Sequence, residues 1–251
     1  MNKKLLLFDV DGTLVDSGND IDHNMVSILK QLKDDGYDLG IAGGGDFNKI
    51  IKQMKNEIYF DHYFSECGCV YFKNLNKNSF NLQLIYKKNI REHEMYLNIN
   101  KIIKKSLEFL SKVEYTLTGN FVDLRTGIVY ISLIGMTATQ EERKYFKDFD
   151  IKNNIRRKLL NILNDYAIEL KVSNSINIVE GGSVGIAIYP KEWDKVQVLS
   201  SLNNYKEIFY FGDKYECGGN DYSLITHEKV KGIKVNCKEE TYRILQDLKF
   251  T

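Results

Sequence analysis

The chain is poor in proline and cysteine and carries almost no net charge. It has one proline and four cysteines in 251 residues, and its 35 lysines and arginines against 34 aspartates and glutamates give a formal net charge of +1. A charge so near zero supplies no broad field for a phosphate backbone or an anionic bilayer, so we expect neither nucleic acid nor membrane as a partner. No apolar run approaches the ~20 residues that span a bilayer.

The cysteines are too sparse to suggest a metal knuckle or a disulfide framework. Cys67 and Cys69 are separated by one residue, while Cys217 and Cys237 stand alone, a spacing that fits neither arrangement. We therefore expect reduced thiols in a cytoplasmic protein. The start of the chain, two lysines and a short apolar stretch that runs into Asp9, has no small-residue cleavage site and predicts a first strand rather than a signal peptide.

Both ends of the chain have the pattern of an α/β domain. Residues 5–8 are a continuous apolar run that is typical of a buried parallel strand, and residues 207–211 form another such run before Gly212. Apolar residues at helical spacing predict a helix over 22–34. The other expected elements of this part are a strand over 37–42, a helix over 47–55 capped by Asp46, and a strand near Tyr71.

The middle of the chain has a different pattern. Residues 120–125 and 128–134 alternate with period two around a Thr-Gly turn, which predicts an antiparallel hairpin. Helices are expected around 98–113, over 140–147 and over 154–170, and a strand pair over 171–188. We therefore predict an α/β core with a parallel sheet, built from residues 1–80 and 189–251, and an inserted α+β domain with an antiparallel sheet over residues 81–188.

The strongest chemical signal is a pair of acids at the end of the first strand. Asp9 and Asp11 are followed by Gly12 and Thr13, at the edge where α/β sheets bind their ligands. Buried carboxylates repel one another and need a counter-ion, and Mg²⁺ prefers oxygen ligands of this kind. The alternative is a capped turn with both acids in water.

Three distant segments could join this pair. Asp213, Asn220 and Asp221 follow the strand over 207–211, and Gly44 and Gly45 follow the strand over 37–42, where their backbone N–H groups could face a phosphate. Lys195 is a candidate cation, although a lone lysine is more often a surface residue.

Taken together, these segments resemble a known family. The order of acids and lysine is similar to the haloacid dehalogenase superfamily, and the chain resembles eukaryotic phosphomannomutases over nearly its whole length. The matching stretches are DVDGTL, GIAGGGDF, FVDLRTGIVYISLIG, QEER, NNIRRK, WDK and FGDKYECGGND.

The resemblance implies a role for each site residue. Asp9 would be the nucleophile that becomes an aspartyl-phosphate, and Asp11 would be the general acid and base. Lys195 would be the cation that neutralises a non-bridging phosphate oxygen in the transition state. It further implies Mg²⁺ held by Asp9, the Asp11 main-chain carbonyl and Asp213, with Asn220 and Asp221 orienting these groups. Arg125 and Arg143, with Gly44 and Gly45, would bind the substrate, and the inserted domain would be a cap through which a homodimer forms.

Several substrate positions depart from the family pattern. Arginine is expected at Gly18 and Met136, serine at Gly45, and a serine and an aspartate at Gly185 and Ala187; His227 stands where a second cation loop has an aspartate. Charged hydrogen bonds are worth roughly 1.5–3 kcal/mol each, so their loss weakens the retention of a bisphosphate intermediate.

We therefore predict a Mg²⁺-dependent phosphotransferase that hydrolyses a small phosphorylated metabolite, a sugar phosphate above all. The alternative is a phosphomannomutase that interconverts mannose 6-phosphate and mannose 1-phosphate. A more remote alternative is a catalytically silent regulator that binds a ligand, which the presence of Asp9, Asp11, Lys195 and Asp213 argues against.

Overall fold

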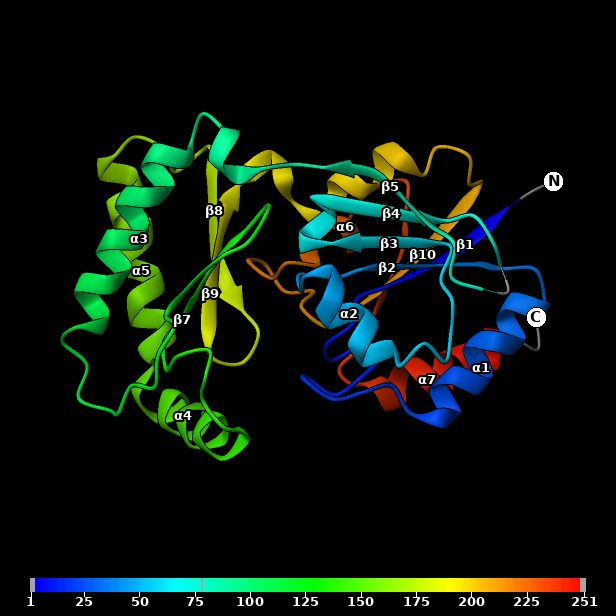
Figure 1. Cartoon of the computed structure of the whole chain (residues 1–251), viewed down its shortest axis with the longest axis horizontal. Coiled ribbons are helices and arrows are strands. Elements are labelled where there is room, and N and C mark those ends of the chain that lie inside the picture. The colour runs from blue at the N-terminus through cyan, green and yellow to red at the C-terminus, as the bar shows by residue number, and fades with distance from the viewer. Residues whose placement is uncertain (1–2, 78, 249–251) are drawn as a thin grey trace. The chain divides into compact units, whose positions relative to one another are not determined.

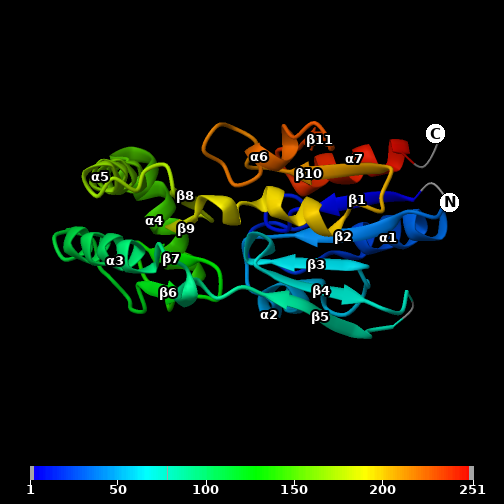
Figure 2. The same cartoon turned by 90° about the horizontal axis from the view of Figure 1, so that it is seen from above.

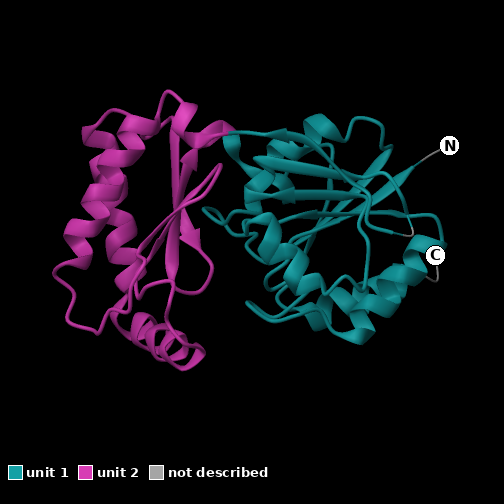
Figure 3. Ribbon diagram, viewed as in Figure 1, with its two compact units in different colours: residues 1–88, 193–251 teal, residues 89–192 magenta. Residues whose placement is uncertain are grey.

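The chain forms two compact units in the computed structural model, which describes residues 3–77 and 79–248 (Figure 3). Unit 1 comprises Met1–Lys88 and Trp193–Thr251, and unit 2 comprises Asn89–Glu192. None of the four cysteines, all in the described residues, forms a disulfide. None of the helices in the described residues combines the length and the apolar character that crossing a bilayer requires.

Unit 1 is built on a seven-stranded sheet with the strand order β11-β10-β1-β2-β3-β4-β5 (Figures 1 and 2). The first five strands in this order run parallel, and β4 and β5 are antiparallel to their neighbours. The strand bounds are β1 Lys4–Phe8, β2 Asp38–Ala42, β3 His62–Ser65, β4 Val70–Asn74, β5 Leu82–Lys87, β10 Glu207–Gly212 and β11 Lys231–Lys234.

Alternation along β1 divides the core of unit 1 into two layers. Leu6 and Phe8 pack in the layer that contains α1, α2 and α7, whereas Leu5 and Leu7 pack in the layer that contains η4 and α6. The helices are α1 His23–Asp34, α2 Phe47–Met54, η1 Glu66–Gly68, η4 Lys195–Ser201, α6 Tyr222–Ile225 and α7 Lys238–Leu248.

Unit 2 has a four-stranded antiparallel sheet of order β6-β7-β9-β8. Helix α5 packs on β8 and β9, and α3 packs on α5. The elements are η2 Ile90–Glu92, α3 Tyr96–Leu110, β6 Val122–Leu124, β7 Val129–Ser132, α4 Gln140–Asn153, α5 Ile155–Glu169, β8 Ile176–Gly181, β9 Gly185–Pro190 and η3 Lys191–Trp193.

The structure confirms the predicted fold class and most of the predicted elements, but it adds strands. Strand β3 lies between two elements that the sequence indicated. Of the two edge strands, β11 has a single large apolar residue, and β5 is mostly exposed in spite of its apolar residues. Since β5 pairs with β4, the first unit boundary lies after Lys88 rather than after residue 80; since β9 continues to Pro190, the second lies after Glu192 rather than after residue 188.

Candidate active site

Asp9 lies directly past the carboxyl end of β1. Its main-chain N–H donates to the carbonyl of Phe211 at 2.9 Å, which extends the pairing of β1 with β10 by one step. By the alternation of the strand, its side chain is on the same face as Leu5 and Leu7, the face covered by η4. Only 5% of Asp9 is exposed. Burial raises the pKa of Asp9 to about 7, and the opposing effect of the nearby Lys195 offsets this rise only in part.

Lys195 opens η4, and Asp194 caps this short helix by accepting from the N–H of Val196. The Lys195 ammonium donates to Asp9 Oδ1 at 2.6 Å and to Asp221 Oδ1 at 2.5 Å. Burial alone would lower the pKa of Lys195, but the carboxylates of Asp221 and Asp9 raise it well above its usual value. The ammonium is therefore a permanent cation inside the site.

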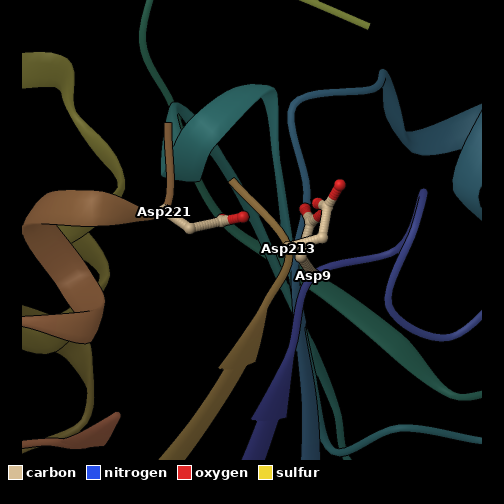
Figure 4. Close-up of side chains that lie close together, drawn as sticks. All are labelled: Asp9, Asp213 and Asp221. Atoms are coloured by element: carbon tan, nitrogen blue, oxygen red, sulfur yellow. The ribbon is translucent and has the colours of Figure 1, made fainter. Parts of the chain in front are cut away.

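Three carboxylates meet at this edge of the sheet. Figure 4 shows Asp9 at the end of β1 and Asp213 at the end of β10, with Asp221 at the start of α6 directing its carboxylate toward them. Each offers an oxygen within 4.8 Å of the others, an arrangement that could hold a metal ion. Burial raises the pKa of Asp213, although Lys214 opposes this effect.

Some side-chain oxygens of this cluster accept hydrogen bonds and others do not. Both oxygens of Asp221 accept hydrogen bonds: Oδ1 accepts from Lys195 and Tyr210, and Oδ2 accepts from the N–H of Lys214 at 2.9 Å. By contrast, Asp213 Oδ1 and Asn220 Oδ1 are buried and accept no hydrogen bond from the described residues. Unsatisfied buried oxygens beside a second carboxylate are the donor set that Mg²⁺ prefers, so these residues fit the ion.

Gly12 shows how closely the chain approaches this cluster. A Cβ at Gly12 would lie 2.5 Å from Asp213 Oδ2, and the residue has a φ of +88°. Both the space and the backbone angle therefore require glycine.

Asp11 is turned toward α2. Its Oδ1 accepts from the N–H of Gly18 and from Gln53 Nε2, both at 2.9 Å, and its Oδ2 accepts from Lys49 Nζ at 2.5 Å. Burial would raise the pKa of Asp11, but Lys49 and the two other donors lower it. The side chain is held as a carboxylate, the form that can accept a proton.

The glycine segment after β2 lies at the same edge. A Cβ at Gly44 would be 3.6 Å from Asn220 Nδ2, and one at Gly45 would be 3.2 Å from Lys49 Cδ. Asp46 caps α2 as predicted, accepting from the N–H of Lys49. The segment thus joins the site residues of unit 1.

The predicted substrate arginines belong to unit 2. Arg125 Nε donates to Asp123 Oδ2 at 2.7 Å, and its guanidinium lies 5.2 Å from the centre of the Tyr130 ring. Arg143 donates to the main-chain carbonyls of Ala138 and Met136. Both side chains therefore already have partners inside the unit.

Three residues of unit 1 were not identified from the sequence. Lys49 and Gln53 hold Asp11, and their spacing of four on α2, which places them on one helix face, was an available signal. Tyr210 contacts Lys195 and Asp221, and its place in an apolar strand gave no sign of this.

Comparison with known proteins identifies the family of the chain. Residues 25–251 match the family described as eukaryotic phosphomannomutase. A phosphomannomutase of Dendrobium officinale is 31% identical over 240 residues, covering 94% of this chain and 90% of its own. Phosphomannomutase 1 of Dictyostelium discoideum is 34% identical over 250 residues, covering 97% and 96%.

Solved structures show the same fold at lower identity. IMP-bound IMP-nucleotidase of Plasmodium falciparum is 18% identical with a TM-score of 0.71, and the match covers 98% of this chain but only 66% of the nucleotidase. The C-terminal domain of trehalose-6-phosphate phosphatase from C. albicans is 15% identical with a TM-score of 0.63, covering 99% and 93%.

These structural relatives share the haloacid dehalogenase fold, and the relatives in sequence are named phosphomannomutases. The sequence match with these named relatives extends across both units of the chain. The chain belongs to the eukaryotic phosphomannomutase family of the haloacid dehalogenase superfamily.

Proposed function

We propose that the chain is a Mg²⁺-dependent phosphomannomutase that interconverts mannose 6-phosphate and mannose 1-phosphate through a phosphorylated Asp9. The observation that carries this proposal is the buried cluster in which Lys195 bridges Asp9 and Asp221 while Asp213 keeps an unsatisfied oxygen. The family of its relatives favours this reaction over the net hydrolysis that the sequence alone suggested.

In the first half-reaction, an Asp9 carboxylate oxygen attacks phosphorus in line with the sugar oxygen. The bond from phosphorus to that oxygen breaks, and its electron pair stays with the sugar oxygen, which takes a proton from the Asp11 carboxyl group. In the second half-reaction, Asp11 accepts the proton of the incoming sugar hydroxyl. The oxygen of that hydroxyl then attacks the phosphorus of phosphoryl-Asp9. The bond between phosphorus and the Asp9 oxygen breaks, and Asp9 returns to a carboxylate.

The protein groups around Asp9 support this transfer in different ways. Lys195 keeps a fixed positive charge 2.6 Å from Asp9 Oδ1, where negative charge is redistributed during the reaction. Lys49, Gln53 and Gly18 hold Asp11 ready to accept a proton. Donating a proton requires the acid form, so the contact between Asp11 and Lys49 has to break in each cycle.

Mg²⁺ would be held by Asp9, the Asp11 main-chain carbonyl and Asp213, with Asn220 beside them. It would offset the charge between a carboxylate nucleophile and an anionic phosphate. Because burial raises the pKa of both Asp9 and Asp213, a bound cation would favour the ionised form of each group.

Unit 2 would supply substrate recognition as a cap. Arg125 and Arg143 would bind the phosphate that is not transferred, since guanidinium groups match phosphate oxygens. A homodimer through this unit belongs to the same proposal and rests on family resemblance alone.

One observation favours hydrolysis as the second candidate. In unit 2 the ring of Tyr130 lies over Gly185, where a Cβ would come within 2.4 Å of Tyr130 Cζ. The serine that the family pattern has at position 185 would clash with this ring, so the loss of that polar group is built into the packing. Fewer polar groups for a second phosphate would shorten the retention of a bisphosphate.

Product analysis distinguishes the two candidates. The protein is incubated with mannose 1-phosphate, Mg²⁺ and a hexose bisphosphate activator, and mannose 6-phosphate and inorganic phosphate are both measured. The proposal predicts mannose 6-phosphate in excess of phosphate, with neither product from Asp9→Asn. Stoichiometric phosphate without mannose 6-phosphate would replace the mutase by the phosphatase, and wild type as inert as Asp9→Asn toward p-nitrophenyl phosphate would favour a silent regulator.

A further inference from the structure

Tyr210 is a fully buried tyrosine in β10 whose hydroxyl lies inside the charged cluster. It pairs with Leu7 of β1 and is 0% exposed. Its side chain shares the layer of Leu5, Leu7 and η4, so the strand itself directs the phenol toward Lys195. An apolar ring would fill this position without bringing a polar group into the core.

The Tyr210 hydroxyl connects two charged residues. It donates to Asp221 Oδ1 at 2.5 Å and accepts from Lys195 Nζ, which lies 3.1 Å away. Burial and the carboxylate of Asp221 raise the pKa of Tyr210 well above its usual value, so the phenol keeps its proton and stays a donor. Lys195 thus has three acceptors, in Asp9, Asp221 and Tyr210, for the three N–H bonds of an ammonium group.

We propose that Tyr210 is a positioning residue that keeps the Lys195 ammonium in place while Asp9 carries the phosphoryl group. The inference rests on the proposed function, because it assigns a task to Tyr210 within that reaction cycle.

The reason is the change in charge at Asp9 during the cycle. Once Asp9 is esterified to phosphorus, its side chain is no longer a carboxylate and becomes a weaker partner for Lys195. The ammonium then depends on Asp221 and Tyr210 to hold its place beside the transferring group. Asp221 is itself fixed by the Tyr210 hydroxyl and by the N–H of Lys214.

The test compares two variants that each remove one buried phenol hydroxyl. Tyr210→Phe keeps the ring and loses both contacts. Tyr63→Phe is the matched control, because Tyr63 is also 0% exposed but its hydroxyl accepts from the N–H of Phe60, away from the cluster. Both proteins are assayed with p-nitrophenyl phosphate and Mg²⁺ in rapid-mixing and steady-state experiments, with phosphoryl-Asp9 measured after acid quench.

For Tyr210→Phe we expect a steady-state rate about tenfold lower, a KM within about twofold of wild type, and more enzyme present as phosphoryl-Asp9. Tyr63→Phe should keep the wild-type rate even if its melting temperature falls. A Tyr210→Phe rate equal to wild type, or an equal loss in both variants, would overturn the inference while leaving the proposed function intact. A wild type that forms no phosphoryl-Asp9 would overturn the proposed function and this inference with it.

A double-mutant cycle shows whether Tyr210 acts through Lys195. In a Lys195→Met background, Tyr210→Phe should change the rate by less than about twofold, since the group that it positions is gone. Rate losses that multiply in the double variant would contradict the inference.

Discussion

The two ends of the seven-stranded sheet both bury charged and polar groups, but within the described residues the network at one end is fully hydrogen-bonded and the cluster at the other is not. At the amino end, Asp38 opens β2 and accepts from Lys77, Lys3 and Tyr205 at 2.7, 3.2 and 2.9 Å. His62, which opens β3, completes this network by contacting the hydroxyls of Tyr205 at 2.6 Å and Tyr71 at 2.7 Å.

At the carboxyl end the groups do not balance. Asp9, Asp213 and Asp221 face the two cations Lys195 and Lys214. Among the described residues, the buried oxygens without a hydrogen bond include those of Asp213 and Asn220, but none from the amino-end network.

This difference in hydrogen bonding distinguishes a structural network at the amino end from a reactive site at the carboxyl end. A network whose members satisfy one another stabilises the fold and has no use for a ligand. A buried cluster with excess negative charge and unsatisfied oxygens is costly unless something binds there. The following predictions are ordered by the size of the expected effect, and each can break or refine this distinction.

Replacing Lys195, the buried cation at the carboxyl end of the sheet, should have the largest effect on catalysis. Lys195→Met removes the partner of Asp9 and Asp221, and we expect kcat to fall by about 10²–10³-fold, as when one fixed charge or donor is lost from a transition state. Steady-state assays at saturating substrate measure this, with circular dichroism to confirm folding. A rate within tenfold of wild type would contradict the role of Lys195.

Acidic pH should lower the free energy of unfolding through His62, at the amino end of the sheet. Burial lowers the pKa of His62 to about 4 from an ordinary value of 6.5. Between these pH values the unfolded chain binds a proton that the folded chain excludes, so stability is complete above pH 6.5 and is lost as the pH falls toward 4. The difference of about 2.5 pH units corresponds to roughly 3 kcal/mol.

Urea unfolding of wild type and His62→Gln from pH 7 to pH 4 measures this contribution. The wild type should lose roughly 3 kcal/mol more than the variant over this range. Asp9, whose pKa is raised to about 7 by burial, contributes the opposite slope in the same window, but it does so in both proteins. Parallel pH profiles would show that His62 carries no such cost.

Mg²⁺ should stabilise the folded protein by binding at the carboxyl end of the sheet and not at the amino end. At about 100 times its dissociation constant the ion adds about 2.7 kcal/mol to the free energy of unfolding, because it binds only the folded state. Asp213→Asn should abolish this increment, whereas Asp38→Asn, at the amino end, should keep it. Denaturant unfolding with Mg²⁺ and with a chelator provides the measurement, and an increment unchanged in Asp213→Asn would move the metal site elsewhere.

The smallest effect is expected from Lys77→Met at the amino end. The Lys77 side chain is 57% exposed and pairs with Asp38 at 2.7 Å, and an ion pair of this kind contributes about 0.2–1 kcal/mol. The variant should lose that much stability in urea unfolding and keep the wild-type kcat. A clear loss of kcat would show that the two ends of the sheet are coupled.

The sequence was sufficient for features that depend on local pattern. The buried strand before Asp9, the cap at Asp46 and the hairpin of unit 2 follow from alternation, side-chain capping and turn residues, and the structure confirms them. Lys195 was only a weak candidate until the resemblance gave it a role, since its contact with Asp9 spans 186 residues of chain. Tyr210 could not be identified, because a hydroxyl in an apolar strand is recognisable only once its partners are placed around it.

The most direct test of the account is to find where phosphorus is bound during turnover. The protein is mixed with p-nitrophenyl phosphate and Mg²⁺, quenched in acid within the first turnover, digested and analysed by mass spectrometry. The account predicts a phosphoryl group on the peptide that contains Asp9, assigned to Asp9 itself and absent from Asp9→Asn. A phosphoryl group on another residue, or product released with no phosphorylated aspartate in a rapid-quench time course, would contradict it.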